Sequence, residues 1–168
     1  MEHRIRLLSE AADKDLALEI FELFAPKIIL NYPFARTWFA EKVLPELATC
    51  RRWVWIVEAE EDPVGIAILK FNPLQKTAAK VSTLFVRDDW RCRGVGTALL
   101  RKILSWQHLG YHQEISIRCP LDIAPVLWPL LRKFSFMREK SPRVISGSSK
   151  LEMSYKRTPK YKGALSSR

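Results

Sequence analysis

The sequence predicts a single α/β (α+β) domain with about seven strands and about four helices. Its 168 residues match the size of one domain and can bury a substantial core. A hydrophobic fraction of 48%, with six tryptophans and eight phenylalanines, is higher than a disordered chain would carry. Segments rich in β-branched or aromatic residues also alternate with segments whose apolar residues recur at helical spacing.

The predicted elements follow one another along the whole chain. Strands are expected at 4–8, 53–57, 64–71, 80–86, 114–118, 134–137 and 150–155, helices at 13–26, 34–44, 97–109 and 122–133, and a mobile loop at 141–149. The polar stretch between the second and third strands predicts an antiparallel hairpin. Pro26 should end the first helix and Pro45 should interrupt or end the second, because proline lacks the N–H that forms the helical hydrogen bond. Pro125 fits a first helical turn, whereas Pro129 should kink the remainder of its helix.

The most informative segment is a glycine loop, Arg91-Cys92-Arg93-Gly94-Val95-Gly96, between a strand and a helix. Glycine lets the backbone approach a ligand without interference from a Cβ atom. The first N–H groups of the following helix have no intrahelical partner, and the helix dipole and two arginines add positive potential. The loop therefore predicts a binding site for an anion such as a pyrophosphate.

Two common nucleotide-binding motifs do not fit this loop. A Walker A loop requires Gly-Lys-Ser/Thr at its end, and Gly96 is followed by Thr97 without a lysine. A dinucleotide-binding fingerprint would need a third glycine where Leu99 stands. Both motifs are excluded by spacing.

The loop resembles motif A of the GNAT superfamily, the acyl-CoA-dependent N-acetyltransferases. That motif reads Arg/Gln-x-x-Gly-x-Gly/Ala after a strand that ends Leu-x-Val, and here Leu84-Phe85-Val86, the connection 87–90 and the loop 91–96 occur in that order. The order of predicted elements is similar as well. The resemblance implies one GNAT-like domain over residues 3–156. Its sheet would be mixed, mostly antiparallel and splayed after the motif A strand. The lysines, Pro159, Gly163 and serines of residues 157–168 predict a basic, flexible tail after the domain.

The resemblance also implies acetyl-CoA as co-substrate and a set of residues that bind it. Backbone groups of Leu84 and Val86 would hydrogen-bond the pantetheine arm, and an N–H would polarise the thioester carbonyl. The N–H groups from Cys92 to Thr97 would bind the pyrophosphate, with Arg91 and Arg93 adding charge. The full expected set is Leu84, Phe85, Val86, Arg91, Cys92, Arg93, Gly94, Val95, Gly96 and Thr97.

No catalytic residue can be assigned from the sequence. Family members often carry a tyrosine and a glycine in Leu-Tyr-x-Lys-x-Gly-Phe, and here those positions are Leu131 and Ser135. Some members place a glutamate base early on the strand before motif A, but Lys80-Val81-Ser82-Thr83 contains no carboxylate. The other titratable candidates are Glu58, Glu60, His108, His112, Cys119 and Tyr155. Cys119 ends the strand that should form one wall of the splay, although a buried inert thiol is expected there.

Three functions remain open at this point. The first is an N-acetyltransferase in which an amine acceptor, a small molecule or a protein- or RNA-linked amine, attacks the acetyl-CoA thioester directly. The second is an acyl-CoA-binding regulatory module with little or no transferase activity, which the leucine at position 131 and the missing carboxylate favour. The third is a nucleic-acid-associated protein that acts through its basic C-terminus.

The net charge of +10 lies mostly at the C-terminus, where residues 132–168 hold 11 basic and 2 acidic groups. Such a run predicts either RNA or another polyanion as a partner, or a solvated tail. Three widely spaced cysteines predict neither disulfides nor a metal site. Without a long apolar segment or a signal peptide, the chain is expected to be cytoplasmic, with no membrane partner. A homodimer is a further expected assembly.

Overall fold

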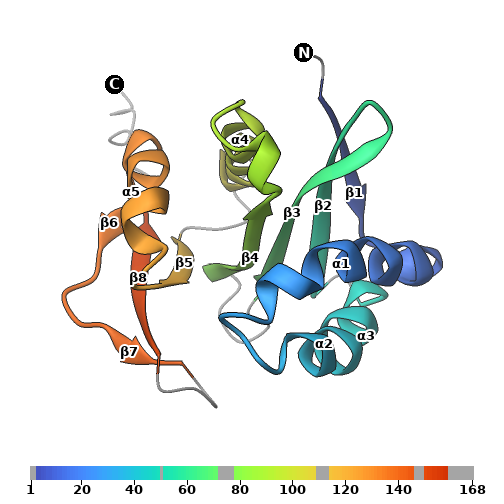
Figure 1. Ribbon diagram of the computed structural model, residues 1–168, viewed down its shortest axis with the longest axis horizontal. Helices are drawn as coiled ribbons and strands as arrows, with labels where there is room; N and C mark the ends of the chain where they lie inside the picture. Colours follow the sequence, from blue (N-terminus) through green and yellow to red (C-terminus); the bar gives the residue numbers. More distant parts are fainter. Residues whose placement is uncertain (1–2, 50, 72–77, 109–113, 146–149, 159–168) are drawn as a thin grey trace, which may run out of the picture.

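The computed structural model describes residues 3–49, 51–71, 78–108, 114–145 and 150–158. Within them one sheet of eight strands runs in the order β1-β2-β3-β4-β5-β8-β6, with β7 also paired to β8 (Figure 1). The strands are β1 (Arg4–Leu8), β2 (Arg52–Ala59), β3 (Asp62–Phe71), β4 (Ala78–Val86), β5 (Glu114–Pro120), β6 (Met137–Arg138), β7 (Arg143–Val144) and β8 (Leu151–Arg157). The helices are α1 (Lys14–Ile28), α2 (Ala35–Trp38), α3 (Leu44–Leu47), α4 (Val95–His108) and α5 (Ala124–Lys133).

The predicted fold class is confirmed. Among the described strands, β4 and β5 form the parallel pair and the other pairs are antiparallel, including the predicted β2–β3 hairpin. Because α2 and α3 form one helical path, the helical segments number about four, as expected. The additional strand is β7, whose two residues lie in the segment predicted as a loop.

The sheet separates two hydrophobic cores. Helices α1, α2 and α3 cover one face in front of β2 and β3 (Figure 1), and α4 and α5 contribute to the core on the other face. Successive side chains of β2 point to opposite faces of the sheet. Val54 and Ile56 belong to the first core, whereas Trp55 and Val57 belong to the second. A strand buried on both faces reads as a continuous apolar run, and the sequence contains such a run here.

Pro26 does not end its helix, so this prediction is wrong. Helix α1 continues through Pro26 to Ile28, and Pro26 is exposed in the last turn. The carbonyl of Glu22, four residues earlier, loses a helical partner on an exposed side where water can replace it.

The other prolines fit their helices better. A π-type turn, Phe39–Val43, interrupts the second helix just before Pro45, which then lies in the first turn of α3. Pro125 lies in the first turn of α5 as predicted, and α5 continues past Pro129 to Lys133. A first turn tolerates proline because its N–H groups have no intrahelical partner.

None of the described helices is long and apolar enough to cross a membrane. Cys50 and residues 159–168 lie outside the described residues. The expectations for the basic C-terminal tail, including a polyanionic partner, therefore remain predictions.

Candidate functional site

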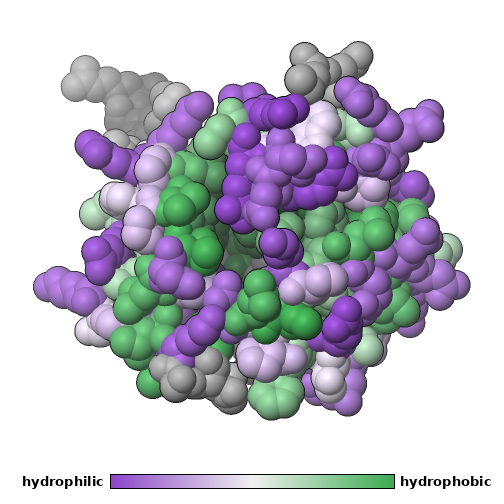
Figure 2. Space-filling model, viewed as in Figure 1, coloured by the Kyte–Doolittle hydropathy of each residue, from purple (hydrophilic) through white to green (hydrophobic). Residues whose placement is uncertain are grey.

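The parallel strands β4 and β5 separate partway along their length. Ala78–Val81 pairs with Glu114–Ile117, and β4 then continues to Val86 with β3 as its partner. A cavity of about 1260 Å³ opens in the gap. Figure 2 shows this face of the molecule hollowed between its two halves, with hydrophobic side chains on the walls. The structure thus contains the predicted splay after the motif A strand.

Strand β4 carries a bulge at the point where it leaves β5. Leu69 of β3 pairs with Val81 of β4. The preceding residue, Ile68, pairs with Thr83, which leaves Ser82 as the extra residue. Bulges bend a strand and redirect its side chains, and they are common next to active sites.

The glycine loop forms the turn that leads into α4. Gly94 has a φ of 89° and Cys92 a φ of 59°, in the left-handed region that only glycine adopts without steric cost. The first helical hydrogen bond joins the N–H of Ala98 to the carbonyl of Gly94 at 2.9 Å. The N–H groups just before Ala98 therefore have no acceptor within the helix, and the positive end of the helix dipole lies at the same place. This arrangement can bind an anion.

Most of the predicted cofactor-binding residues line the cavity, namely Leu84, Phe85, Val86, Arg91, Cys92, Gly94, Gly96 and Thr97. The side chain of Val95 is instead buried in the core, and Arg93 does not line the cavity. At Gly96 a Cβ atom would lie 3.1 Å from Cδ2 of Leu130 on α5. The absence of a side chain at Gly96 therefore lets the start of α4 approach α5 closely.

The two arginines of the loop have partners of their own. The guanidinium of Arg91 lies 2.8 Å from the carboxylate of Asp88, and both side chains are about half exposed. The guanidinium of Arg93 lies 5.1 Å from the centre of the Trp90 ring. An anion in the loop would share Arg91 with Asp88, so the backbone N–H groups are the more direct donors.

The structure separates the titratable residues suggested by the sequence. Glu58 and Glu60 lie at the β2–β3 turn and do not line the cavity. His112 and the side chain of His108 lie outside the described residues. Leu131, at the family's tyrosine position, is fully buried in the core.

Cys119 does line the cavity, on the β5 wall. Burial first, and then the carboxylates of Glu152 and Asp122, raise the pKa of its thiol to about 11. Tyr155 is buried in the core and stacks on Trp128 with 5.5 Å between ring centres. Neither group is ionised near neutral pH, as expected for a structural thiol and a core tyrosine.

A polar cluster at the other end of the cavity was not apparent from the sequence. Its members are Tyr32 after α1, Arg52 on β2, Lys70 on β3, Lys80 on β4, Arg118 on β5 and Glu152 on β8. Because each comes from a different element, no short motif contains two of them. The signal that could have found part of the cluster is the position of Arg52 and Lys70 at the ends of otherwise apolar strands.

Arg52 anchors this cluster. Its side chain is only 4% exposed, and its Nε lies 2.6 Å from the Glu46 carboxylate of α3. Its Nη1 donates a hydrogen bond to the Ser82 hydroxyl at the bulge, at 3.3 Å. Across the gap, Arg118 pairs with Glu152 at 3.3 Å. Both ion pairs hold charged groups in fixed positions on the cavity wall.

The cavity changes the proton affinity of two further cluster members. Burial first, then the carboxylate of Glu152, raises the pKa of the Tyr32 hydroxyl well above its usual value. Burial first, then the Arg118 guanidinium, lowers the pKa of the Lys80 ammonium. Tyr32 is thus a neutral hydroxyl that can donate a hydrogen bond, and Lys80 is a cation with incomplete charge compensation.

Within the described part of the chain, no three His, Cys, Asp or Glu residues are grouped so that they could hold a metal ion. The cavity lining includes the backbone of the glycine loop, the Tyr32 hydroxyl and the charged groups of the polar cluster.

The model of the acetyltransferase (GNAT) family matches residues 17–119, more than half of the chain. No curated protein matches the sequence. Many solved structures do match the fold. The acetyltransferase from Salmonella typhimurium that modifies the N-terminal serine of ribosomal protein L7/L12 is 12% identical, with a TM-score of 0.69 over 95% of this chain and 96% of that one.

Two further similar structures contain the cofactor. The PaiA N-acetyltransferase of Thermoplasma acidophilum, in complex with coenzyme A, is 17% identical, with a TM-score of 0.64 over 92% of this chain and 98% of that one. A family acetyltransferase from Elizabethkingia anophelis with acetyl-CoA bound is 13% identical, with a TM-score of 0.55 over 78% and 87% of the two chains. At these identities the likeness concerns the fold.

Proposed function

The chain belongs to the GNAT acetyltransferase family, and we propose that it transfers an acetyl group from acetyl-CoA to an amine acceptor by direct attack of the amine on the thioester. One observation carries the proposal: the start of α4, with its unpaired N–H groups, opens onto the same cavity that separates β4 from β5. The anion site at the start of α4 is thereby continuous with the gap between β4 and β5, which can hold an extended pantetheine arm.

The cofactor would lie along this cavity. The N–H groups from Cys92 to Thr97 would bind its pyrophosphate, with Arg91 nearby. Beyond Val81, the edge of β4 that faces β5 pairs with none of the described strands, so the backbone of Leu84 and Val86 can hydrogen-bond the pantetheine arm. An N–H of this edge would also polarise the thioester carbonyl and stabilise the oxyanion that forms there.

The reaction exchanges one bond for another. The amine nitrogen bonds to the carbonyl carbon, the carbon–sulfur bond breaks, the nitrogen loses a proton and the departing thiolate gains one. A carboxylate and a hydroxyl are present in the cavity as Glu152 and Tyr32. The amine must be neutral when it attacks. The Tyr32 hydroxyl stays protonated because burial raises its pKa, so it can donate a hydrogen bond to a charge that develops in the cavity.

Calorimetry with acetyl-CoA tests the cofactor site through the Thr97→Glu variant. A carboxylate in the first turn of α4 suits the helix dipole but repels a pyrophosphate, so the fold should persist while affinity falls at least about 30-fold, or roughly 2 kcal/mol. Ser105→Glu adds the same charge to an exposed position of the same helix and should leave affinity within about twofold.

Equal affinity of the two variants, or no binding of acetyl-CoA at submillimolar concentration, would overturn the cofactor assignment. Release of coenzyme A in the presence of amines tests the transfer itself. Tight binding of acetyl-CoA without turnover of any amine would instead support the acyl-CoA-binding regulatory module.

A further inference from the structure

Three cations, Arg52, Lys70 and Lys80, stand side by side on the sheet at the end of the cavity that holds the polar cluster. In the strand register Arg52 lies opposite Lys70, and Lys70 lies opposite Lys80. Directly opposed side chains have Cβ atoms about 4.5–5.5 Å apart, and like charges in such pairs destabilise a sheet. Arg118 of β5, across the gap, adds a fourth cation to the lining of the same cavity.

Carboxylates compensate only part of this charge. Glu46 is engaged with Arg52 and Glu152 with Arg118. Among the described residues, no ion pair includes Lys70 or Lys80. The sequence of the segment 72–77 that joins their strands contains no acidic residue either. Two lysines thus line the cavity together with two arginines, and the two carboxylates nearby are each paired with an arginine.

The row of Arg52, Lys70 and Lys80 is separate from the proposed cofactor phosphate site. Lys80 precedes Val86 by six residues on β4, which corresponds to roughly 20 Å along an extended strand. The row also lies at the ends of β2 and β3 beneath the α2–α3 path, because Arg52 contacts both Trp38 and Glu46. The phosphates at α4 and the cations at Lys80 therefore mark opposite ends of the cavity.

We propose that the amine acceptor carries an oxyanion group, a carboxylate or a phosphate, and that Lys80, Lys70 and Arg118 bind this group. The inference rests on the proposed acetyl transfer and names the class of its acceptor. A cation that is partly buried next to other cations gains more from an incoming anion than a solvated surface lysine does. Depression of the Lys80 pKa agrees with such a setting.

The same cations bear on the amine itself. A positive potential disfavours an ammonium and so lowers the pKa of an amine bound beside it, which increases the neutral, nucleophilic form. This effect lessens the need for a carboxylate base on β4, where Lys80 stands in the region that is acidic in some family members. It also disfavours acceptors with several positive charges.

The test measures release of coenzyme A for pairs of acceptors in which one member carries an anionic group and the other a neutral one. The pairs are the common α-amino acids with their carboxamides, and O-phosphoethanolamine with ethanolamine. The amine of an amino acid carboxamide has the lower pKa, so amine basicity alone would favour the neutral member. The anionic member of at least one pair should have a kcat/KM higher by about tenfold or more. The two kinds of pair distinguish a carboxylate from a phosphate.

Variants assign the effect to the row. Lys80→Met should reduce the preference for the anionic acceptor at least about tenfold, by raising the KM of that acceptor. Lys80→Arg should retain most of the preference. Lys102→Met removes an exposed lysine of α4 and should change nothing. Removing a charge from a like-charge row should not unfold the protein, which thermal melting of each variant without ligand would verify.

Two outcomes would overturn the inference. One is equal or better turnover of the neutral members, and the other is an undiminished anion preference in Lys80→Met. If no pair is turned over, thermal shifts with coenzyme A and the same compounds decide the matter: no greater shift for any anionic member also overturns it. Failure of the wild-type protein to bind acetyl-CoA would instead count against the proposed function.

Discussion

Two cysteines on different walls of the cavity differ in their exposure. Cys92 is exposed in the glycine loop, whereas Cys119 is 4% exposed on β5. Burial raises the pKa of the Cys119 thiol to about 11, so that about one thiol in a thousand is ionised at pH 8. The chemistry of Cys119 is thus set by packing and neighbouring carboxylates, which a sequence position alone does not specify.

Alkylation with iodoacetamide should therefore distinguish the two thiols. In a Cys50→Ser background at pH 8, we expect modification of Cys92 and not of Cys119, measured by mass spectrometry of peptides. The pKa of Cys119 is raised from 9.0 to about 11 in the folded protein. The contribution of its neutral thiol to stability is therefore fully present below pH 9 and is lost as the pH rises through about 11. Modification of Cys119 should appear in that range. Rapid modification of Cys119 in the native protein at pH 8 would contradict its burial.

At the scale of elements, the β2–β3 hairpin closes through two residues in an unfavourable conformation. Ala59 pairs with Asp62, and the turn residues Glu60 and Glu61 have φ angles of 53° and 71°. Positive φ at both central positions is typical of a type I′ turn, for which Asn-Gly is the preferred sequence. Side chains other than glycine carry a steric cost of roughly 1–2 kcal/mol per residue there.

Replacing these residues with Asn-Gly should stabilise the protein by about 1 kcal/mol, measured by urea unfolding. The matched control Glu60→Gln with Glu61→Gln removes the same two charges and keeps both Cβ atoms. Backbone strain is the cause only if the control gains much less than Asn-Gly. Equal gains would show that charge repulsion near Asp62 dominates instead.

Elements with local signals were predictable, and contacts that depend on register were not. The glycine loop could be recognised because Gly94 and Gly96 each meet a local requirement, a positive φ and a close approach. The end of α1 was mispredicted at Pro26, because a proline in an exposed last turn costs less than one in a helix interior. Lys70 and Lys80 are neighbours because β3 pairs with β4 in a particular register, and no sequence motif predicts that register.

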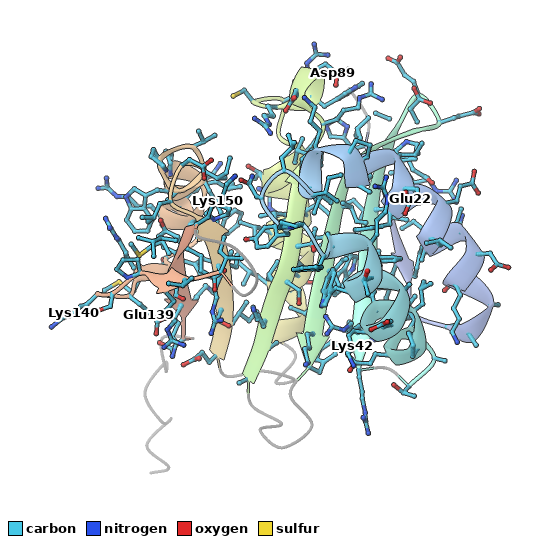
Figure 3. The ribbon with its side chains drawn as sticks, turned by 60° about the horizontal axis from the view of Figure 1, so that its bottom comes forward. Glu22, Lys42, Asp89, Glu139, Lys140 and Lys150 are labelled. Carbon is cyan, nitrogen blue, oxygen red and sulfur yellow. The ribbon has the colours of Figure 1, made fainter. Side chains whose placement is uncertain are left out.

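At the scale of the whole molecule, the cavity divides the sheet into two unequal halves. The half formed by β5, β6, β7 and β8 joins the other half through the short β4–β5 pairing. Lys150 adds a contact across the gap: its ammonium donates to the carbonyl of Leu30 at 2.9 Å and to the side chain of Asn31 at 2.8 Å. Figure 3 shows Lys150 between the two halves. Its partners immediately precede Tyr32, so the contact also positions the polar cluster.

Removing this contact should loosen the α1–α2 connection without unfolding the sheet. In Lys150→Met we expect faster hydrogen–deuterium exchange over residues 29–34 and a loss of about 1 kcal/mol in the free energy of unfolding. The control is Lys156→Met, which removes ion pairs with Glu114 and Glu139 that lie within one half.

The control should therefore lower stability without a selective change over 29–34. Similar exchange over 29–34 in both variants would show that the two halves are held in place by the β4–β5 pairing alone. A selective increase in Lys150→Met would mean that Tyr32 and the polar cluster depend on a contact between segments 120 residues apart. Acceptor binding between the halves should then reduce the exchange over 29–34, because a ligand that contacts both walls replaces the lost contact.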